Sequence, residues 1–301
     1  MFKAKILADS INVTSTKRII TFELEYPRFI HSEVMTHRVF SRNAASSRAI
    51  PVERMIAQVL ADPAMPIHWG ANRPGMQAHE ELGERSLERC RELWIEAASE
   101  AVRIAQRMTA IGLHKQVANR ILEPFQWMRT IVTSTEWDNF FALRMHPDAQ
   151  PEFQHLARVM YATKRQSDTQ FKEPGEWHLP YPFQGDIADE MTLAEMLKGS
   201  VAACARVSYR QHDGSNRTLA NDMALFDRLV TATPMHASPL EHQVLCVDTG
   251  LLLDRELERN FRGGWVPLRS FLELPFTDHN TELYRPCLNV NRPVMISGST
   301  E

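Results

Sequence analysis

Apolar and polar residues alternate near the amino terminus in a pattern that predicts a β-strand and then a short helix. Residues 17–25 (KRIITFELE) place apolar side chains at every second position, as in a strand with one buried face. From Arg28 to Phe40, apolar residues recur at helical spacing instead. Residues 36–50 (THRVFSRNAASSRAI) begin at the C-terminus of this helix, and we expect a loop there.

The middle of the chain carries the strongest helical pattern. Residues 80–111 are rich in Glu, Arg and Ala around one apolar stripe. Because this stretch exceeds the usual length of a helix, we expect a kink or a break in it. The β-branched residues at 128–134 predict a strand, and we expect Thr135 to cap the helix that follows. Further helices are predicted at residues 51–61, 136–144 and 151–162.

A polar, proline-containing stretch at residues 166–189 predicts a linker between an N-terminal half (1–165) and a C-terminal half (190–301). Each half contains a strand pattern followed by a helix pattern, at residues 19–40 and 243–265. A repeat and a coincidence explain this equally well. We therefore predict an α+β fold and leave open whether its halves are related. In the C-terminal half we expect helices at 192–207, 218–232 and 254–260, and a strand at 241–248.

Composition predicts a packed protein without a general affinity for nucleic acids or membranes. The 301 residues are 44% apolar and 24% charged, with a net charge of −3. The start of the chain lacks the apolar core of a signal peptide, and no run approaches the roughly 20 apolar residues that span a bilayer. The four cysteines form no CxxC pair, so we expect neither disulfides nor a zinc site. These features indicate a cytoplasmic protein.

The segment 36–50 is basic, because no acidic residue occurs between Glu33 and Glu53. Its arginines provide paired donors for phosphate or carboxylate, and its hydroxyl groups add neutral donors. One interpretation is therefore a nucleotide phosphate site. The alternative is a solvated turn whose charge is balanced by acids from elsewhere in the fold.

Two other segments carry candidate chemistry. In residues 133–144 (TSTEWDNFFALR), a helix would let Asn139 and Arg144 approach one ligand, although capping and surface solvation explain the same residues. Residues 235–242 (MHASPLEH) contain two histidines and a glutamate without HExxH spacing, so we expect no metal. They form either a polar turn or a turn that contacts a cofactor. The chain has no GxGxxG, GxxxxGK[ST] or GxSxG motif.

Together these three segments resemble the flavin-dependent thymidylate synthases. The signature of that family is Arg-His-Arg, seven residues, and Ser, and here His37 and Arg38 are followed by seven residues and Ser46. Thr36 replaces the first arginine and Ala44 a common glutamate. Ser41, Asn43 and Arg48 also stand where the family often has these residues.

The second and third elements of the family match in part. Asn139 and Arg144 agree with the later half of its Asn-Phe-x-x-x-Arg element, whereas two earlier polar positions are Thr133 and Thr135. HASPLEH (236–242) resembles His-Glu-Thr-Pro-Phe-Glu-His, but it lies about 200 residues after the arginine loop instead of before it. A permuted or duplicated arrangement would bring both elements to one site.

The resemblance implies an α+β fold with long flanking helices, and conversion of dUMP to dTMP. Methylenetetrahydrofolate would provide the carbon, and FAD reduced by NADPH the hydride. It also implies a homotetramer. A hydroxymethylase acting on dUMP or dCMP and a non-catalytic nucleotide-binding homologue are the alternatives. By this match Arg144 holds the pyrimidine. The nucleotide would be bound by Ser46, Ser47, Arg48 and, more weakly, Arg120, and Ser46 would also have a catalytic role. The residues that would contact FAD are His37, Arg38, Asn43, Asn139, His236, Ser238 and Glu241.

Overall fold

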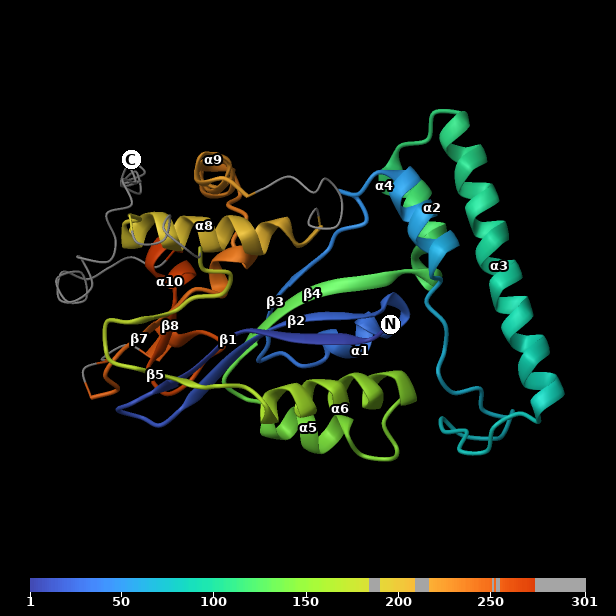
Figure 1. The fold of residues 1–301 in the computed structure, drawn as a ribbon, viewed down its shortest axis with the longest axis horizontal. Helices are drawn as coiled ribbons and strands as arrows, with labels where there is room; N and C mark the ends of the chain where they lie inside the picture. Colours follow the sequence, from blue (N-terminus) through green and yellow to red (C-terminus); the bar gives the residue numbers. More distant parts are fainter. Residues whose placement is uncertain (184–189, 209–216, 251, 253–254, 274–301) are drawn as a thin grey trace, which may run out of the picture.

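The computed structural model describes residues 1–183, 190–208, 217–250, 252 and 255–273. Its centre is a five-stranded sheet with the strand order β3-β4-β2-β1-β5 (Figure 1). The predicted strands at 17–25 and 128–134 are confirmed as β2 and β4, whereas β1 and β5 were not predicted. The strands are β1 (Lys3–Asn12), β2 (Arg18–Pro27), β3 (Ser41–Ala44), β4 (Trp127–Ser134) and β5 (Gln170–Lys172).

The segment expected to be a loop contains the edge strand β3. It pairs antiparallel with β4, with Ser41 opposite Thr133 and Ala44 opposite Thr130. The loop prediction was therefore wrong for residues 41–44. The preceding helix α1 (His31–Met35) is short, and the chain reaches β3 five residues after it ends. Only four residues pair, too few for an alternating pattern to stand out in the sequence.

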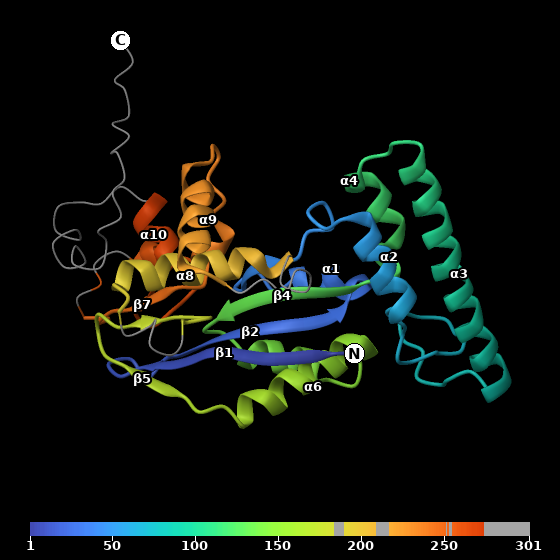
Figure 2. The same ribbon diagram turned by 45° about the horizontal axis from the view of Figure 1, so that its top comes forward.

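The central strand β2 is buried on both faces, contrary to the half-buried strand that its alternation predicts. Phe22 and Leu24 pack with residues of α5 (Asp138–Arg144) and α6 (Pro151–Arg165). On the other face, Ile19 packs with Val244, Phe261 and Trp265 from the C-terminal half. Figure 2 shows α6 on one side of the sheet and α8 and α9 on the other.

A separate helical layer lies beyond one end of the sheet (Figure 1). It consists of α2 (Val52–Ala61), α3 (Glu84–Ala110), α4 (Lys115–Ala118) and the 3-10 helix η2 (Asn119–Phe125), which share an apolar cluster. The predicted helices at 51–61 and 80–111 are confirmed. The expected break is wrong, because α3 continues through 27 residues. Thr135 does not cap α5, whose N-cap is Trp137.

A second sheet, with the order β6-β7-β8, lies under helices of the C-terminal half. The predicted helices at 192–207 and 218–232 are confirmed, and the predicted strand at 241–248 is shortened to β7. The segment that we predicted to be a linker contains β5, which belongs to the first sheet, and β6, which belongs to the second. Residues 184–189 of this segment lie outside the described residues. The division into halves stays a prediction. The elements are β6 (Trp177–His178), α8 (Leu193–Ala205), α9 (Leu219–Thr231), η4 (Ser238–Glu241), β7 (Val244–Cys246), η5 (Arg255–Glu258), β8 (Trp265–Pro267) and α10 (Leu268–Glu273).

The two sheets are joined by the side chain of Asn12 at the end of β1. Its Nδ2 donates to the carbonyls of Val247 at 2.9 Å and Gly263 at 3.0 Å, and its Oδ1 accepts from the backbone N–H of Thr14 at 2.9 Å. Gly264, at φ 78°, lies so close that an added Cβ would meet the Val247 carbonyl at 2.3 Å. The predicted α+β class is confirmed, and these contacts fix the C-terminal half on the central sheet.

Candidate functional site

The guanidinium of Arg144, at the end of α5, is held by three contacts. Its Nε donates to Nε2 of His37 at 2.9 Å, and its Nη2 donates to Oγ1 of Thr36 at 3.0 Å. The guanidinium carbon also lies 4.7 Å from the ring centroid of Phe153, a cation–π distance. Because these contacts come from two separate segments, residues 36–37 and α6, Arg144 has a fixed direction before any ligand binds.

His37 is neutral at physiological pH. Burial, followed by the charges of Arg144 and Arg42, lowers the pKa of its imidazole to about 4. Its Nε2 therefore carries a lone pair, which is what the N–H of Arg144 requires. His37 and Arg144, which were predicted for different ligands, are thus brought together as a neutral acceptor and a cation. Thr36, which departs from the family pattern, completes the contact.

Strand β3 connects this pair to the displaced HASPLEH turn. Nη1 of Arg42 donates to the carbonyl of His37 at 3.2 Å and to that of Met35 at 3.0 Å, at the end of α1. Next to it, Oδ1 of Asn43 accepts a hydrogen bond from Oγ of Ser238 at 3.2 Å. Two predicted residues that are 195 positions apart in sequence are therefore in contact within one chain. Glu241, in the same turn, pairs with Arg269.

Two of the predicted phosphate-binding residues already bind an internal carboxylate. Oε1 of Glu123 accepts from Oγ of Ser47 at 3.0 Å and from Nη1 of Arg120 at 3.0 Å, and lies 2.9 Å from Nη2 of Arg28. Sequence reasoning missed Glu123, which lies outside the basic segment. At Ser47, an acid from elsewhere in the fold thus contacts the basic segment, as the alternative interpretation of that segment predicts.

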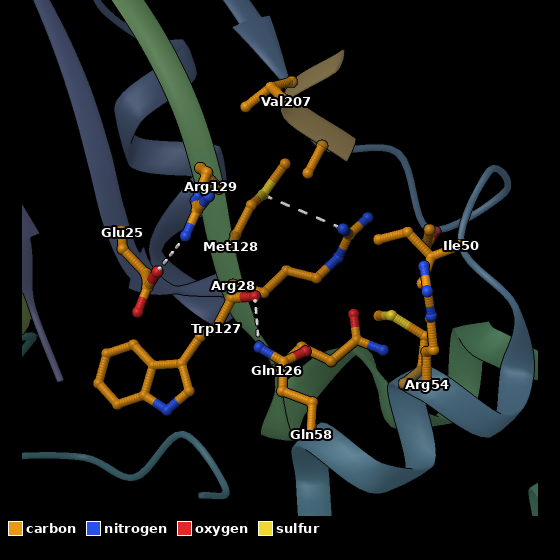
Figure 3. A pocket seen from close by; sticks show the side chains of 13 residues that line it. Glu25, Arg28, Ile50, Arg54, Gln58, Gln126, Trp127, Met128, Arg129 and Val207 are labelled. Atoms are coloured by element: carbon orange, nitrogen blue, oxygen red, sulfur yellow. Dashed lines mark hydrogen bonds and ion pairs between the residues drawn. The ribbon is translucent and has the colours of Figure 1, made fainter. Parts of the chain in front are cut away.

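A pocket next to Ser47 adds more basic groups. Arg28, Arg54 and Arg129 line it together with Gln126, and Arg129 pairs with Glu25 at 3.2 Å (Figure 3). Both polar atoms of the buried Gln126 side chain lack a hydrogen-bond partner among the described residues. Since these residues lie outside the motifs, this pocket could not be predicted from the sequence.

The remaining predicted residues lie at the surface or near it. Arg38, Arg48, Asn139 and His236 are exposed, and no side chain among them makes a hydrogen bond or ion pair with another described residue. Ser46, which lies between Arg38 and Arg48 in the sequence, is half-buried. The two arginines therefore keep their charges available to an anion, unlike Arg120 and Arg42.

Neither a metal centre nor a membrane span is apparent in the described ranges. No three His, Cys, Asp or Glu side chains within them cluster as metal ligands would. None of the helices there combines the length and the apolar character needed to cross a bilayer.

Solved structures similar to this chain include nucleotide-modifying enzymes. A UMP/dUMP methylase PolB from Streptomyces cacaoi bound with 5-Br UMP is 16% identical, with a TM-score of 0.47 over 55% of this chain and 89% of that chain. The same enzyme bound with 5-Br dUMP gives a TM-score of 0.45 at 16% identity, over 55% and 91%. Thymidylate Synthase X from Helicobacter pylori with FAD and dUMP is 18% identical, with a TM-score of 0.34 over 50% and 69%.

Comparison with curated proteins gives no match. The family model described as thymidylate synthase complementing protein matches residues 16–167, half of the chain. The match spans β2, the basic segment, α5 and all of α6, and so includes His37, Asn43 and Arg144. It ends before the HASPLEH turn. The chain belongs to the thymidylate synthase complementing protein family.

Proposed function

We propose that this protein is a flavin-dependent enzyme that methylates dUMP to dTMP, with methylenetetrahydrofolate as the one-carbon donor. The observation that carries the proposal is the fixed Arg144 guanidinium beside the neutral His37, within the family match. Transfer of a one-carbon unit to C5 of uracil requires negative charge to be stabilised on the ring. A preorganised cation is suited to this, because it pays no reorganisation cost during the reaction.

For the nucleotide phosphate, the charges favour Arg48 with Ser46. Arg48 is exposed, and its side chain has no acidic partner within the described residues. Ser47 and Arg120 can take part only if a phosphate competes with, or displaces, the carboxylate of Glu123. We therefore assign the phosphate first to Arg48 and place Arg120 in a secondary role.

For FAD, the residues at the junction of β3 and η4 fit a polar cofactor. Asn43 and Ser238 are in contact, and the exposed amide of Asn139 and imidazole of His236 have no partner among the described residues. These groups, with Arg38, His37 and Glu241, would hold the cofactor by hydrogen bonds. FAD, when bound, supplies the hydride, with NADPH as the reductant. A homotetramer belongs to the same proposal.

The test begins with the visible spectrum of the purified protein, as isolated and again after incubation with FAD and removal of the unbound flavin. A protein that stays colourless under both conditions refutes a flavoenzyme. Given flavin binding, turnover is measured with dUMP, methylenetetrahydrofolate and NADPH, and the product is weighed by mass spectrometry. A product with the mass of dTMP supports methylation. A product with the mass of 5-hydroxymethyl-dUMP would show that the reaction is a hydroxymethylation instead.

The role of Arg144 is tested by replacement. Arg144→Ala should abolish dUMP-dependent turnover and leave flavin bound, because the guanidinium acts on the pyrimidine. Leu143→Ala is the matched control, since Leu143 is the preceding residue on α5 and is 53% exposed. If Arg144→Ala turns over at the rate of the control, the assigned role is wrong.

A further inference from the structure

Five buried side chains form one continuous line of hydrogen bonds between the two sheets, which we call the relay. Oγ of Ser10 lies 2.9 Å from Nδ1 of His178, and Nε2 of His178 lies 2.8 Å from Oγ1 of Thr21. Oγ1 of Thr21 lies 2.7 Å from Oγ1 of Thr133, which lies 2.8 Å from Nδ1 of His242. All five residues are at most 2% exposed.

Both histidines of the relay are neutral. Burial, followed by the charges of Lys172 and His242, lowers the pKa of His178 to about 3. Burial lowers the pKa of His242 to about 3 as well. Each imidazole therefore carries one N–H and one lone pair.

Each of the five members of the relay has one proton to donate, and each of its four contacts needs one. The hydroxyls of Thr21 and Thr133 have no acceptor outside the relay among the described residues, so each donates inside it. All four contacts must then point the same way, which leaves two possible directions. When His242 donates from Nδ1, every contact points toward Ser10, and both histidines are Nδ1–H tautomers. When Ser10 donates instead, every contact points toward His242, and both are Nε2–H tautomers. The spare proton is on Ser10 in the first case and on Nε2 of His242 in the second.

The surroundings of the two ends favour the first direction. Ser10 lines a cavity of about 370 Å³ together with Asp9 and Lys172, where water can accept its spare proton. Nε2 of His242 is buried and has no partner among the described residues. A buried N–H without an acceptor is the rarer arrangement in proteins, whereas an acceptor without a donor is tolerated more often.

The relay ends where the candidate site begins. His242 directly follows η4, which contains Ser238 and Glu241. Its partner Thr133 is the residue of β4 that faces Ser41 of β3, two residues before Asn43. A change in the contact between His242 and Thr133 would therefore move the turn relative to Asn43.

We propose that the relay is a positioning device that fixes His242 as the Nδ1–H tautomer and holds the turn Ser238–Glu241 against β4. The relay itself depends only on this chain. Its benefit for cofactor binding rests on the function proposed above.

The first test is long-range ¹H–¹⁵N NMR of the full chain labelled in histidine, at pH 7. His178 and His242 should both appear as Nδ1–H tautomers. Thr133→Val should change the tautomer of His242, and Thr133→Ser should restore it. Thr130→Val is the control, because Thr130 is equally buried in β4 but bonds to the Tyr26 hydroxyl at 2.8 Å. Opposite tautomers, or an unchanged His242 in Thr133→Val, would overturn the proposal.

Ser10→Ala provides a second variant if Thr133→Val does not fold. Without the hydroxyl, Nδ1–H of His178 loses its acceptor, so both histidines should shift together toward Nε2–H. A shift of His178 alone contradicts a connected relay. The binding test is FAD titration, in which Thr133→Val should weaken affinity about fivefold relative to Thr130→Val, the effect of one hydrogen bond. Equal FAD affinities of Thr133→Val and Thr130→Val refute the positioning role. If no form of the protein binds FAD, the proposed function is refuted, but the tautomer result is unaffected.

Discussion

Acidification from pH 7.5 to 5.0 should destabilise this protein strongly, because four histidines are held neutral in the fold. Burial is the main cause at each one. It lowers the pKa of His31 and His37 to about 4, and that of His178 and His242 to about 3. In the unfolded chain the same groups titrate near 6.5. Between these values the unfolded state binds more protons, so the free energy of unfolding falls as the pH falls.

The size of the effect follows from the two pKa values. At pH 5.0, each histidine shifts the equilibrium toward the unfolded chain by about 2 kcal/mol relative to pH 7.5. Solvent contact at His31 and His37 reduces their share, so the four together should cost about 6 to 8 kcal/mol. A domain has only about 5 to 15 kcal/mol of stability in total. We therefore expect unfolding to begin close to pH 5.

The assay is urea unfolding followed by tryptophan fluorescence at pH 7.5, 6.5, 5.5 and 5.0. His242→Gln should reduce the loss of free energy between the extremes by about 2 kcal/mol, because one of the four groups no longer titrates. His79→Gln, at an exposed position, is the matched control and should keep the full loss. A total loss below about 2 kcal/mol, the expected share of a single histidine, would refute the reasoning.

Two further replacements test single contacts. Glu123→Gln should increase the affinity for dUMP, measured calorimetrically, by about fivefold. The reason is that removing about 1 kcal/mol of like-charge repulsion frees Arg120 for the phosphate. An unchanged or lower affinity would count against a phosphate near this carboxylate. Asn12→Ala should lower the free energy of unfolding by about 3 kcal/mol, because two buried carbonyls lose their donor. Asn72→Ala, at an exposed loop position, is the control in urea unfolding. Equal free energies of unfolding for the two variants would show that the Asn12 contacts between the sheets are unimportant.

Local patterns predicted the longer elements well because those elements have strong periodicity. The helices α3 and α6 and the strand β4 each contain enough residues for a clear period. The short strands β5, β6 and β8, with two or three residues each, have no period of their own. They exist because tertiary pairing supplies their hydrogen bonds, which a local pattern does not contain.

Burial of β2 on both faces illustrates a second limit. Its alternation predicts one buried face, since Thr21 and Glu23 are polar. Thr21 is nevertheless fully buried, because its hydroxyl bonds to Thr133 and His178. A polar side chain whose partner is about 110 or 160 residues away looks like a surface residue in the sequence. The relay was missed for the same reason.

The charge of the segment 36–50 was predictable, but the acids that balance it were not. Burial lowers the pKa of the Arg42 guanidinium, and the charges of Tyr26 and then Glu241 act in the opposite direction. Ser47 bonds to Glu123, which also pairs with Arg120. Both acids lie more than 70 positions beyond the segment and reach it only through the fold. A phosphate dianion approaching the segment would thus meet uncompensated charge mainly at its exposed arginines, and this, more than the motif, is why we assign it to Arg48.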